Sequence, residues 1–233
     1  NVLITAHTGS GKTVLAIYGI AHSIKNNKKV IYTSPTKSLS NQKYNEFMKL
    51  FGETTSIGIM TGDIKVNPDA QIVIMTTEIL RNLLYKDKQL DGLTINPFLN
   101  MDDVGCVLFD EVHYINDSDR GEVWEESIIM LRPEINLVML SATIDKAEQF
   151  CSWIGNIKRK PIHLIKTSHR VVPLKHYFWK DIHYKDEHDK DRIRWEMVQI
   201  CDNNGNFKNY DRIKYKYKKH KNSFVVEKLI DYL

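Results

Sequence analysis

The chain has 233 residues, a formal net charge of +4 and 42% hydrophobic residues. That length allows one large domain or one domain with part of another, and the hydrophobic fraction excludes wholesale disorder. No stretch approaches the ~18 consecutive apolar residues of a membrane span, and the three cysteines are too widely spaced for a zinc or disulfide framework. We therefore expect a soluble, intracellular protein, with no indication of compartment.

Short apolar, β-branched runs alternate with helical patterns through the first 160 residues. The predicted strands span residues 2–5, 30–33, 56–60, 72–76, 106–109 and 136–140. The predicted helices span residues 13–24, 39–51, 78–84, 123–131 and 146–154. Most strands are apolar on both faces, so the sequence predicts an α/β fold with a parallel sheet between two helix layers. In the second helix, an apolar stripe is predicted to enter the core, formed by Tyr44, Phe47, Met48 and Phe51.

The pattern changes beyond about residue 160, where the chain becomes mixed, strand-like and then strongly charged. We expect residues 1–178 to form a first domain and residues 179–222 to form a linker or surface insertion. Residues 223–233 resume an amphipathic pattern and are expected to begin a second domain. Because the chain opens on a strand with no preceding turn or cap, we expect it to be a piece of a longer protein.

A glycine-containing loop connects the first predicted strand to the first predicted helix. Its residues are Ala6, His7, Thr8, Gly9, Ser10, Gly11, Lys12 and Thr13. Gly9 and Gly11 let the backbone turn so that consecutive N–H groups face phosphate oxygens, and the helix adds its positive N-terminal end. In such a loop the lysine, Lys12, pairs with the β- and γ-phosphates, and the hydroxyl of Thr13 ligates Mg²⁺. The loop therefore predicts a site for a nucleoside triphosphate.

Two adjacent carboxylates, Asp110 and Glu111, follow the apolar strand at residues 106–109. The carboxyl end of a strand is where open α/β sheets place ligand-binding groups. There Asp110 can hold Mg²⁺ through its water shell, while Glu111 orients and deprotonates the attacking water. Loop and acids together predict nucleotide hydrolysis, with Lys12, Asp110 and Glu111 as its catalytic residues.

The segments between and after these motifs narrow the class of nucleotide hydrolase. Residues 34–44, 61–63 and 75–81 follow the second, third and fourth predicted strands, and residues 120–126 and 141–143 follow the acids. This series resembles the first RecA-like domain of superfamily-two helicases. Within them it resembles the superkiller-type (Ski-two-like) DExH-box RNA helicases, including the exosome-associated members. The resemblance covers residues 1–177, and the stretches at residues 41–44 and 75–81 are specific to that branch.

The resemblance implies a role for each matched position. Residues 6–13 bind ATP, and Asp110 and Glu111 serve Mg²⁺ and water activation. Three residues couple the nucleotide site to the nucleic acid and to movement: His113, Ser141 and Thr143. Eight residues grip a nucleic-acid backbone: Pro35, Thr36, Lys37, Thr61, Gly62, Thr76, Thr77 and Glu78. Backbone N–H groups and hydroxyls at strand ends suit phosphates irrespective of base sequence. The alternative, that Thr76, Thr77 and Ser38 are only helix caps, stays open.

The activity that the resemblance implies is ATP-dependent unwinding of RNA, with ATP and Mg²⁺ as cofactors. The implied partners are single-stranded RNA, a second RecA-like domain of the same chain and the RNA-decay machinery, with no membrane. Two alternatives remain: a DNA helicase or translocase of the same superfamily, and a scaffold that binds ATP without hydrolysing it. Because the second domain completes the ATP site in this family, residues 1–233 alone are expected to be poorly active.

Overall fold

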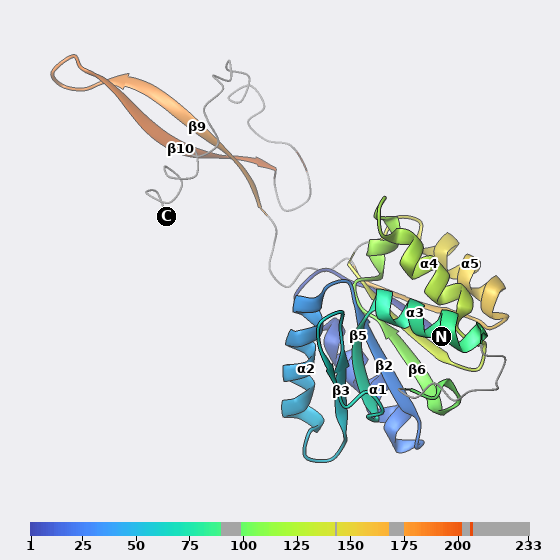
Figure 1. Ribbon diagram of the computed structural model, residues 1–233. Helices are drawn as coiled ribbons and strands as arrows, with labels where there is room; N and C mark the ends of the chain where they lie inside the picture. Colours follow the sequence, from blue (N-terminus) through green and yellow to red (C-terminus); the bar gives the residue numbers. More distant parts are fainter. Residues whose placement is uncertain (90–98, 143, 168–174, 202–205, 207–233) are drawn as a thin grey trace. The chain divides into compact units, whose positions relative to one another are not determined.

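The computed structural model describes residues 1–89, 99–142, 144–167, 175–201 and 206. The chain divides into two compact units, Asn1–His169 and Arg170–Leu233. The first unit is built on an eight-stranded sheet with the order β4-β3-β5-β2-β6-β7-β1-β8 (Figure 1). The strands are β1 (Val2–Thr5), β2 (Lys29–Ser34), β3 (Ile57–Met60), β4 (Lys65–Val66), β5 (Ile72–Thr76), β6 (Val104–Phe109), β7 (Asn136–Ser141) and β8 (His163–Lys166).

All pairs in this sheet are parallel except β3 with the short β4. The connecting helices are α1 (Lys12–Lys25), α2 (Lys37–Phe51), α3 (Thr77–Gln89), α4 (Gly121–Met130) and α5 (Ala147–Lys158). Two 3₁₀ turns flank β6, namely η1 (Met101–Asp103) and η2 (Val112–Asn116). Because the strands are parallel, their carboxyl ends share one edge of the sheet, and the loops that follow them are neighbours there.

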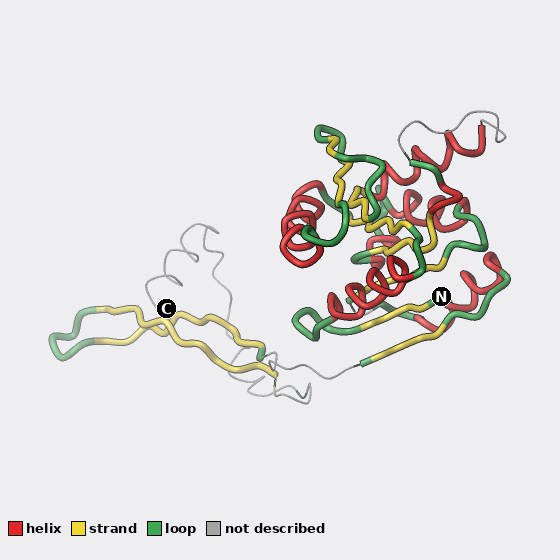
Figure 2. The backbone as a smooth tube through the Cα atoms, turned by 90° about the horizontal axis from the view of Figure 1, so that it is seen from below, coloured by secondary structure: helices red, strands yellow, loops and turns green. Residues whose placement is uncertain are grey.

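The sheet separates two hydrophobic clusters, because successive side chains of a strand point to opposite faces. On one face, Tyr32 of β2 and its neighbours pack against Ala16 and Ile20 of α1 and Phe47 of α2. On the other face, Ile31 of β2 belongs to a cluster that includes buried residues of α3, α4 and α5. Figure 2 shows helices on both sides of the strands. The predicted α/β fold, a parallel sheet between two helix layers, is confirmed.

The six predicted strands and five predicted helices are all present. The main differences are at helix ends, since α3 continues to Gln89 and α5 to Lys158. One core prediction is wrong: Met48 is 42% exposed, whereas Phe47 is fully buried. The buried face of α2 runs through Ser40, Lys43 and Phe47, so polar side chains occupy positions that the apolar stripe did not include.

The described part of the second unit is a two-stranded antiparallel ribbon of β9 (His176–Lys185) and β10 (Asp191–Cys201). Asp186 fixes the connecting turn, because its carboxylate accepts the N–H groups of His188 and Lys190, each at 3.0 Å. The ribbon lies across the predicted domain boundary at residue 178, and residues 179–201 of the expected linker or surface insertion belong to it. The helix predicted at residues 223–233 lies outside the described residues. In the described part of the chain, no helix is long and apolar enough to cross a membrane.

Candidate nucleotide and nucleic-acid sites

The lateral order of the strands sorts the predicted motifs into two groups along the carboxyl edge of the sheet. The segments predicted to grip nucleic acid follow β3, β5 and β2, which are consecutive neighbours. The acids, the Ser141 segment and the phosphate loop follow β6, β7 and β1, which continue the same order. The residues predicted to bind nucleic acid and those predicted to bind nucleotide therefore occupy adjoining halves of this edge, which meet between β2 and β6. We refer to them as the nucleic-acid half and the nucleotide half.

The predicted phosphate loop leaves β1 and turns into α1 through two glycines with left-handed backbone conformation. Gly9 has φ 81° and Gly11 has φ 83°, and a Cβ atom on either would meet nothing within 4 Å. The glycines are thus required by the backbone conformation rather than by crowding. The N–H of Ala6 donates to the carbonyl of Ser141 at 3.1 Å, which ties the loop to the end of β7.

Lys12 lies back over the loop. Its ammonium group donates to the carbonyl of Ala6 at 2.7 Å and to that of His7 at 3.2 Å. The His7 carbonyl also accepts the hydroxyl of Ser10 at 2.6 Å. An ammonium group has three donors, so these contacts hold Lys12 over the loop and leave a donor for an anionic ligand.

Asp110 is held by two hydrogen bonds at the end of β6. Its Oδ2 accepts the hydroxyl of Tyr32 at 2.5 Å, and its Oδ1 accepts the N–H of Glu111 at 3.0 Å. Burial raises the pKa of Tyr32 well above its usual range, and the negative charge of Asp110 raises it further. Tyr32 therefore stays protonated and remains a donor to the carboxylate. The sequence analysis missed Tyr32, because a tyrosine within an apolar strand carries no signal of this role.

Glu111 follows with a left-handed backbone, φ 53° and ψ 45°, an uncommon conformation for a residue other than glycine. Its Oε2 lies 3.4 Å from Nδ1 of His113 without forming a hydrogen bond. Among the described residues, six buried side-chain polar atoms lack a hydrogen-bond partner, and three of them are Glu111 Oε2, His113 Nδ1 and Ser141 Oγ. Unsatisfied buried groups are rare in native structures, and binding of a ligand or water is one way in which they complete their bonding. Thr143 lies outside the described residues.

A second residue that the sequence analysis missed is Lys43, which reaches the nucleotide half from α2. Its ammonium group is buried, 2.8 Å from Oε2 of Glu46 and 3.4 Å from the hydroxyl of Thr13. Lys43 belongs to the branch-specific stretch at residues 41–44, and its place in that stretch was the signal that could have identified it as a site residue. Through it, α2 contacts the side chain predicted to ligate Mg²⁺.

The donors present fit Mg²⁺, which prefers oxygen ligands and commonly uses one or two side chains together with substrate phosphates. Thr13 supplies a hydroxyl oxygen, and Asp110 supplies a carboxylate already oriented by Tyr32. In the ranges that the structure describes, no group of three or more His, Cys, Asp or Glu residues could hold a metal. A magnesium ion here would therefore depend on the nucleotide for most of its ligands.

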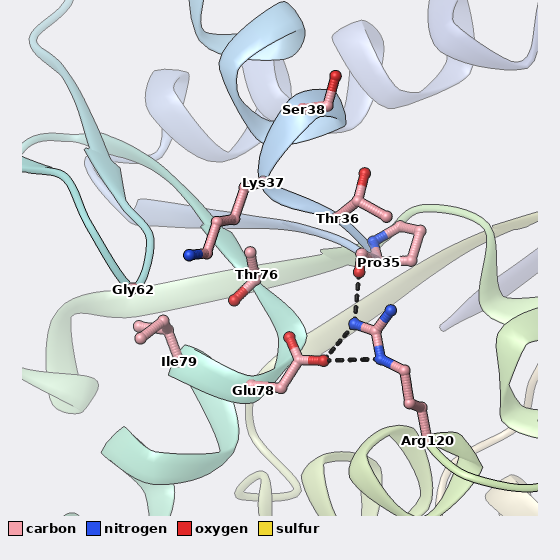
Figure 3. Close-up of a pocket in the computed structure, with 9 residues that line it drawn as sticks. All are labelled: Pro35, Thr36, Lys37, Ser38, Gly62, Thr76, Glu78, Ile79 and Arg120. Atoms are coloured by element: carbon pink, nitrogen blue, oxygen red, sulfur yellow. Dashed lines mark hydrogen bonds and ion pairs between the residues drawn. The ribbon is translucent and has the colours of Figure 1, made fainter.

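The nucleic-acid half contains a pocket of about 550 Å³ (Figure 3). It is lined by Pro35, Thr36, Lys37, Ser38, Gly62, Thr76, Glu78, Ile79 and Arg120. Six of the eight residues predicted to grip nucleic acid are among them. The other two support the backbone: Thr61 accepts the N–H of Ile64 at 3.2 Å, and Thr77 donates to the carbonyl of Ser34 at 3.5 Å. Arg120 was not among the predicted contacts.

Two helices begin at this pocket. The hydroxyl of Thr36 caps α2 by accepting the N–H of Leu39 at 3.3 Å, and α3 begins at Thr77. Lys37 lies 2.5 Å from Asp63, in a pair whose side chains are 53% and 70% exposed. Exposed pairs of this kind contribute little, so Lys37 can exchange its partner for a phosphate. A Cβ on Gly62 would lie 3.3 Å from the Lys37 ammonium, so glycine leaves room for that side chain.

Comparison with known proteins agrees with this arrangement. Residues 1–150 match the family model of the DEAD/DEAH box helicases. The chain is 48% identical over 179 residues to the ATP-dependent RNA helicase mtr4 of Schizosaccharomyces pombe, covering 77% of this chain and 15% of that protein. It is 42% identical over 221 residues to the antiviral helicase SKI2 of Saccharomyces cerevisiae, covering 95% of this chain and 15% of that protein. The chain thus spans about a seventh of the length of these relatives.

Among solved structures, the DUF1998 helicase MrfA bound to DNA matches with a TM-score of 0.57 and 19% identity, over 72% of this chain and 25% of that one. At that identity the likeness shows the fold alone. The family match covers well over half of the chain, and the two curated relatives extend it at more than 40% identity. The chain therefore belongs to the DEAD/DEAH box helicase family, and its relatives are of the Mtr4 and SKI2 type.

Proposed function

We propose that this chain is the first RecA-like domain of an ATP-dependent RNA helicase, in which Mg-ATP hydrolysis drives movement along single-stranded RNA. The observation that carries the proposal is the division of one sheet edge into a phosphate-loop half and a pocket half, joined at β2 and β6. Each half supplies a different function, and the shared strands connect them.

In the nucleotide half, residues 6–13 bind the phosphates of ATP, with Lys12 on the β- and γ-phosphates. Thr13 and Asp110 are the residues that would hold Mg²⁺, Asp110 by way of water, and the ion would neutralise charge on the phosphates. Glu111 orients the attacking water and accepts its proton. The free carboxylate oxygen of Glu111 and the hydrogen bonds that fix Asp110 support these roles.

In the nucleic-acid half, the pocket binds the phosphates of a single strand through Lys37, hydroxyls and N–H groups at the starts of α2 and α3. Helix N-termini favour anions, and such contacts carry no base preference. We assign contacts with the phosphate backbone of the RNA to Pro35, Thr36, Lys37, Gly62 and Thr76, and to the main-chain N–H of Glu78 rather than its carboxylate. Thr61 and Thr77 act indirectly, by holding the loops that carry their neighbours.

Coupling between the halves uses His113, Ser141 and Thr143. His113 adjoins Glu111, and the carbonyl of Ser141 holds the phosphate loop, so a change at the nucleotide can reach both.

The names of the curated relatives favour RNA over DNA as the substrate. On the same basis we propose a second RecA-like domain beginning near residue 223, a linker or insertion over residues 179–222, and association with the RNA-decay machinery. Free, buried Cys106 and Cys151 suit an intracellular location.

The test of the hydrolysis mechanism is Glu111→Gln in the full-length protein. The amide keeps the size of the side chain but cannot accept the proton, so ATP turnover should fall at least about 100-fold. ATP affinity should stay within about threefold, because Lys12 and the loop are unchanged. Turnover and binding of a fluorescent ATP analogue are measured side by side.

The matched control is Glu122→Gln, on the exposed start of α4, which should leave both quantities unchanged. Turnover that survives Glu111→Gln would contradict the assigned role. Wild-type protein that binds ATP without any turnover, with or without nucleic acid, would favour the scaffold instead.

A further inference from the structure

Arg120 lies at the pocket in the nucleic-acid half and makes hydrogen bonds through two nitrogens of its guanidinium group (Figure 3). Its Nε donates to Oε1 of Glu78 at 3.1 Å, and its Nη2 donates to the same oxygen. Nη2 also donates to the carbonyl of Pro35 at 2.5 Å. The guanidinium carbon lies 5.8 Å from the ring centre of Trp124, within the range of a cation–π contact.

These contacts tie together the elements that form the pocket. Pro35 precedes α2, Glu78 lies in the first turn of α3, and Trp124 is a fully buried residue of α4. The backbone of Arg120 is fixed as well, because its N–H donates to the carboxylate of Asp117 at 2.9 Å. Arg120 is thus a rigid bridge between the walls of the pocket.

The charge of Glu78 makes this bridge significant for binding. A carboxylate suits the N-terminal end of α3, because the helix dipole is positive there. The same carboxylate lines a pocket that we propose binds phosphates, and an unpaired negative charge would repel them. Arg120 contacts that carboxylate through two of its nitrogens, and both side chains are about one-third exposed. The pair is therefore partly shielded from solvent, where charge interactions are stronger than at the open surface.

We infer that Arg120 is a positioning residue of the nucleic-acid pocket: it cancels the charge of Glu78 and holds the Pro35 carbonyl, so that the pocket accepts a phosphate backbone. The inference rests on the proposed function of the pocket. A purely structural ion pair would also explain the contacts, but it makes the opposite prediction for the removal of Glu78.

The experiment measures binding of a fluorescein-labelled oligouridine to the full-length protein by anisotropy, over a series of salt concentrations. Arg120→Gln removes the charge and leaves an amide that extends only about as far as the Nε of arginine, which donates to Glu78 in the wild type. It should raise the dissociation constant about tenfold at low salt, and the difference should shrink as salt rises. In the RNA-stimulated ATPase, the RNA concentration at half-stimulation should rise, while the rate at saturating RNA stays close to wild type.

Glu78→Gln gives the decisive comparison. Alone it should bind RNA as tightly as wild type or more tightly, because a negative charge leaves the pocket. Combined with Arg120→Gln it should return the dissociation constant to within about threefold of wild type. If Glu78→Gln weakens binding, or if the double variant is no better than Arg120→Gln, Arg120 has only a structural role and the inference is wrong. Should Arg120→Gln fail to fold, RNA binding by Glu78→Gln alone still tests the inference, because weaker binding than wild type would contradict it.

Two controls separate this inference from the function on which it rests. Arg132→Gln removes another arginine paired with two carboxylates, Asp87 and Asp102, away from the pocket, and it should leave RNA binding unchanged. Lys37→Ala should weaken RNA binding whatever the role of Arg120. If Lys37→Ala weakens RNA binding and Arg120→Gln does not, the inference about Arg120 is wrong, but the pocket is still supported as the RNA-binding site. If neither variant changes binding, the pocket is not the nucleic-acid site and both fail.

Discussion

Tyr32 and Lys43 contact the two side chains on which the proposed magnesium site depends. Tyr32 donates to Asp110, and Lys43 contacts the hydroxyl of Thr13. Both project from elements that also lead toward the nucleic-acid pocket, since β2 and α2 flank Pro35 and Thr36. A buried donor that is fully bonded holds its partner in one orientation, which is what a site for a small cation requires.

Cys106 provides a prediction at the residue scale that concerns stability. Burial raises the pKa of its thiol to about 11, partly opposed by a hydrogen bond with Ser23. An unfolded cysteine titrates near ~8.5, so the thiol stabilises the folded state fully below that pH. Its contribution is lost as the pH rises toward the folded value. The free energy of unfolding should fall by up to about 1.4 kcal/mol per pH unit from this group in that window.

The measurement compares urea unfolding of wild type and Cys106→Ala at pH 8 and pH 10.5. Wild type should lose more stability between the two pH values than the variant does. Tyr32 is also a buried titratable group with a raised pKa, but it is present in both proteins and cancels in the comparison. Equal losses in the two proteins would show that Cys106 does not titrate as its burial predicts.

At the residue scale, the sequence predicted the side chains that belong to contiguous motifs. The glycine loop, the two acids and most of the pocket residues were found because their chemistry shows in the residue types and their spacing. Tyr32, Lys43 and Arg120 were missed because each reaches its site from a distant part of the chain. Tyr32 and Asp110 are 78 residues apart, and Arg120 and Pro35 are 85 apart. Spacing along the sequence carries no record of such contacts.

At the scale of elements, α2 shows how far periodicity predicts packing. The apolar stripe identified the helix and its central core residue, Phe47, but assigned Met48 to the same face. The observed buried face instead includes Ser40 and Lys43, whose polar groups have hydrogen-bond partners. Ser40 shares a hydrogen bond of 2.8 Å with Ser34, and Lys43 contacts Thr13. Polar residues with buried partners are invisible to a hydrophobic pattern, and this shifted the predicted face.

Two substitutions in α2 test the corrected face. Phe47→Ala should lower the free energy of unfolding by about 3–5 kcal/mol, because it removes a fully buried ring that packs edge-on against Tyr32. Met48→Ala, one residue away, should change it by less than about 0.5 kcal/mol, because that side chain is 42% exposed. Chemical denaturation of both variants checks the contrast. Similar losses in the free energy of unfolding at the two positions would show that Met48 belongs to the buried face, as the apolar stripe predicted.

The ribbon of β9 and β10 is the element that the sequence predicted least well. Its charged side chains suggested a linker or a surface insertion, because strands are normally recognised by one apolar face. The ribbon instead forms through main-chain pairing and a turn held by Asp186, which also accepts Nε of Arg192 at 2.8 Å. A two-stranded ribbon has no core of its own, so no alternation of apolar residues was required.

At the scale of the whole molecule, the lateral order of the strands brings motifs that are separate in the sequence next to one another at one edge of the sheet. The alternation of strands and helices predicted a parallel sheet but not the lateral order of its strands. That order sets β2 beside β6, so the strand that leads into the nucleic-acid pocket also carries the tyrosine bonded to Asp110. Strand β2 therefore connects Asp110, through Tyr32, to Pro35, which directly follows the same strand.

We propose that ATP hydrolysis at this site is coupled to single-stranded RNA. The most direct measurement is ATP turnover by the full-length protein with single-stranded RNA or DNA of the same length and sequence, with Glu111→Gln confirming that the turnover arises at this site. The two strands differ at the 2′-hydroxyl, the group by which proteins distinguish them, and in uracil against thymine. RNA should stimulate turnover more strongly than DNA. Equal stimulation, or stronger stimulation by DNA, would contradict the account.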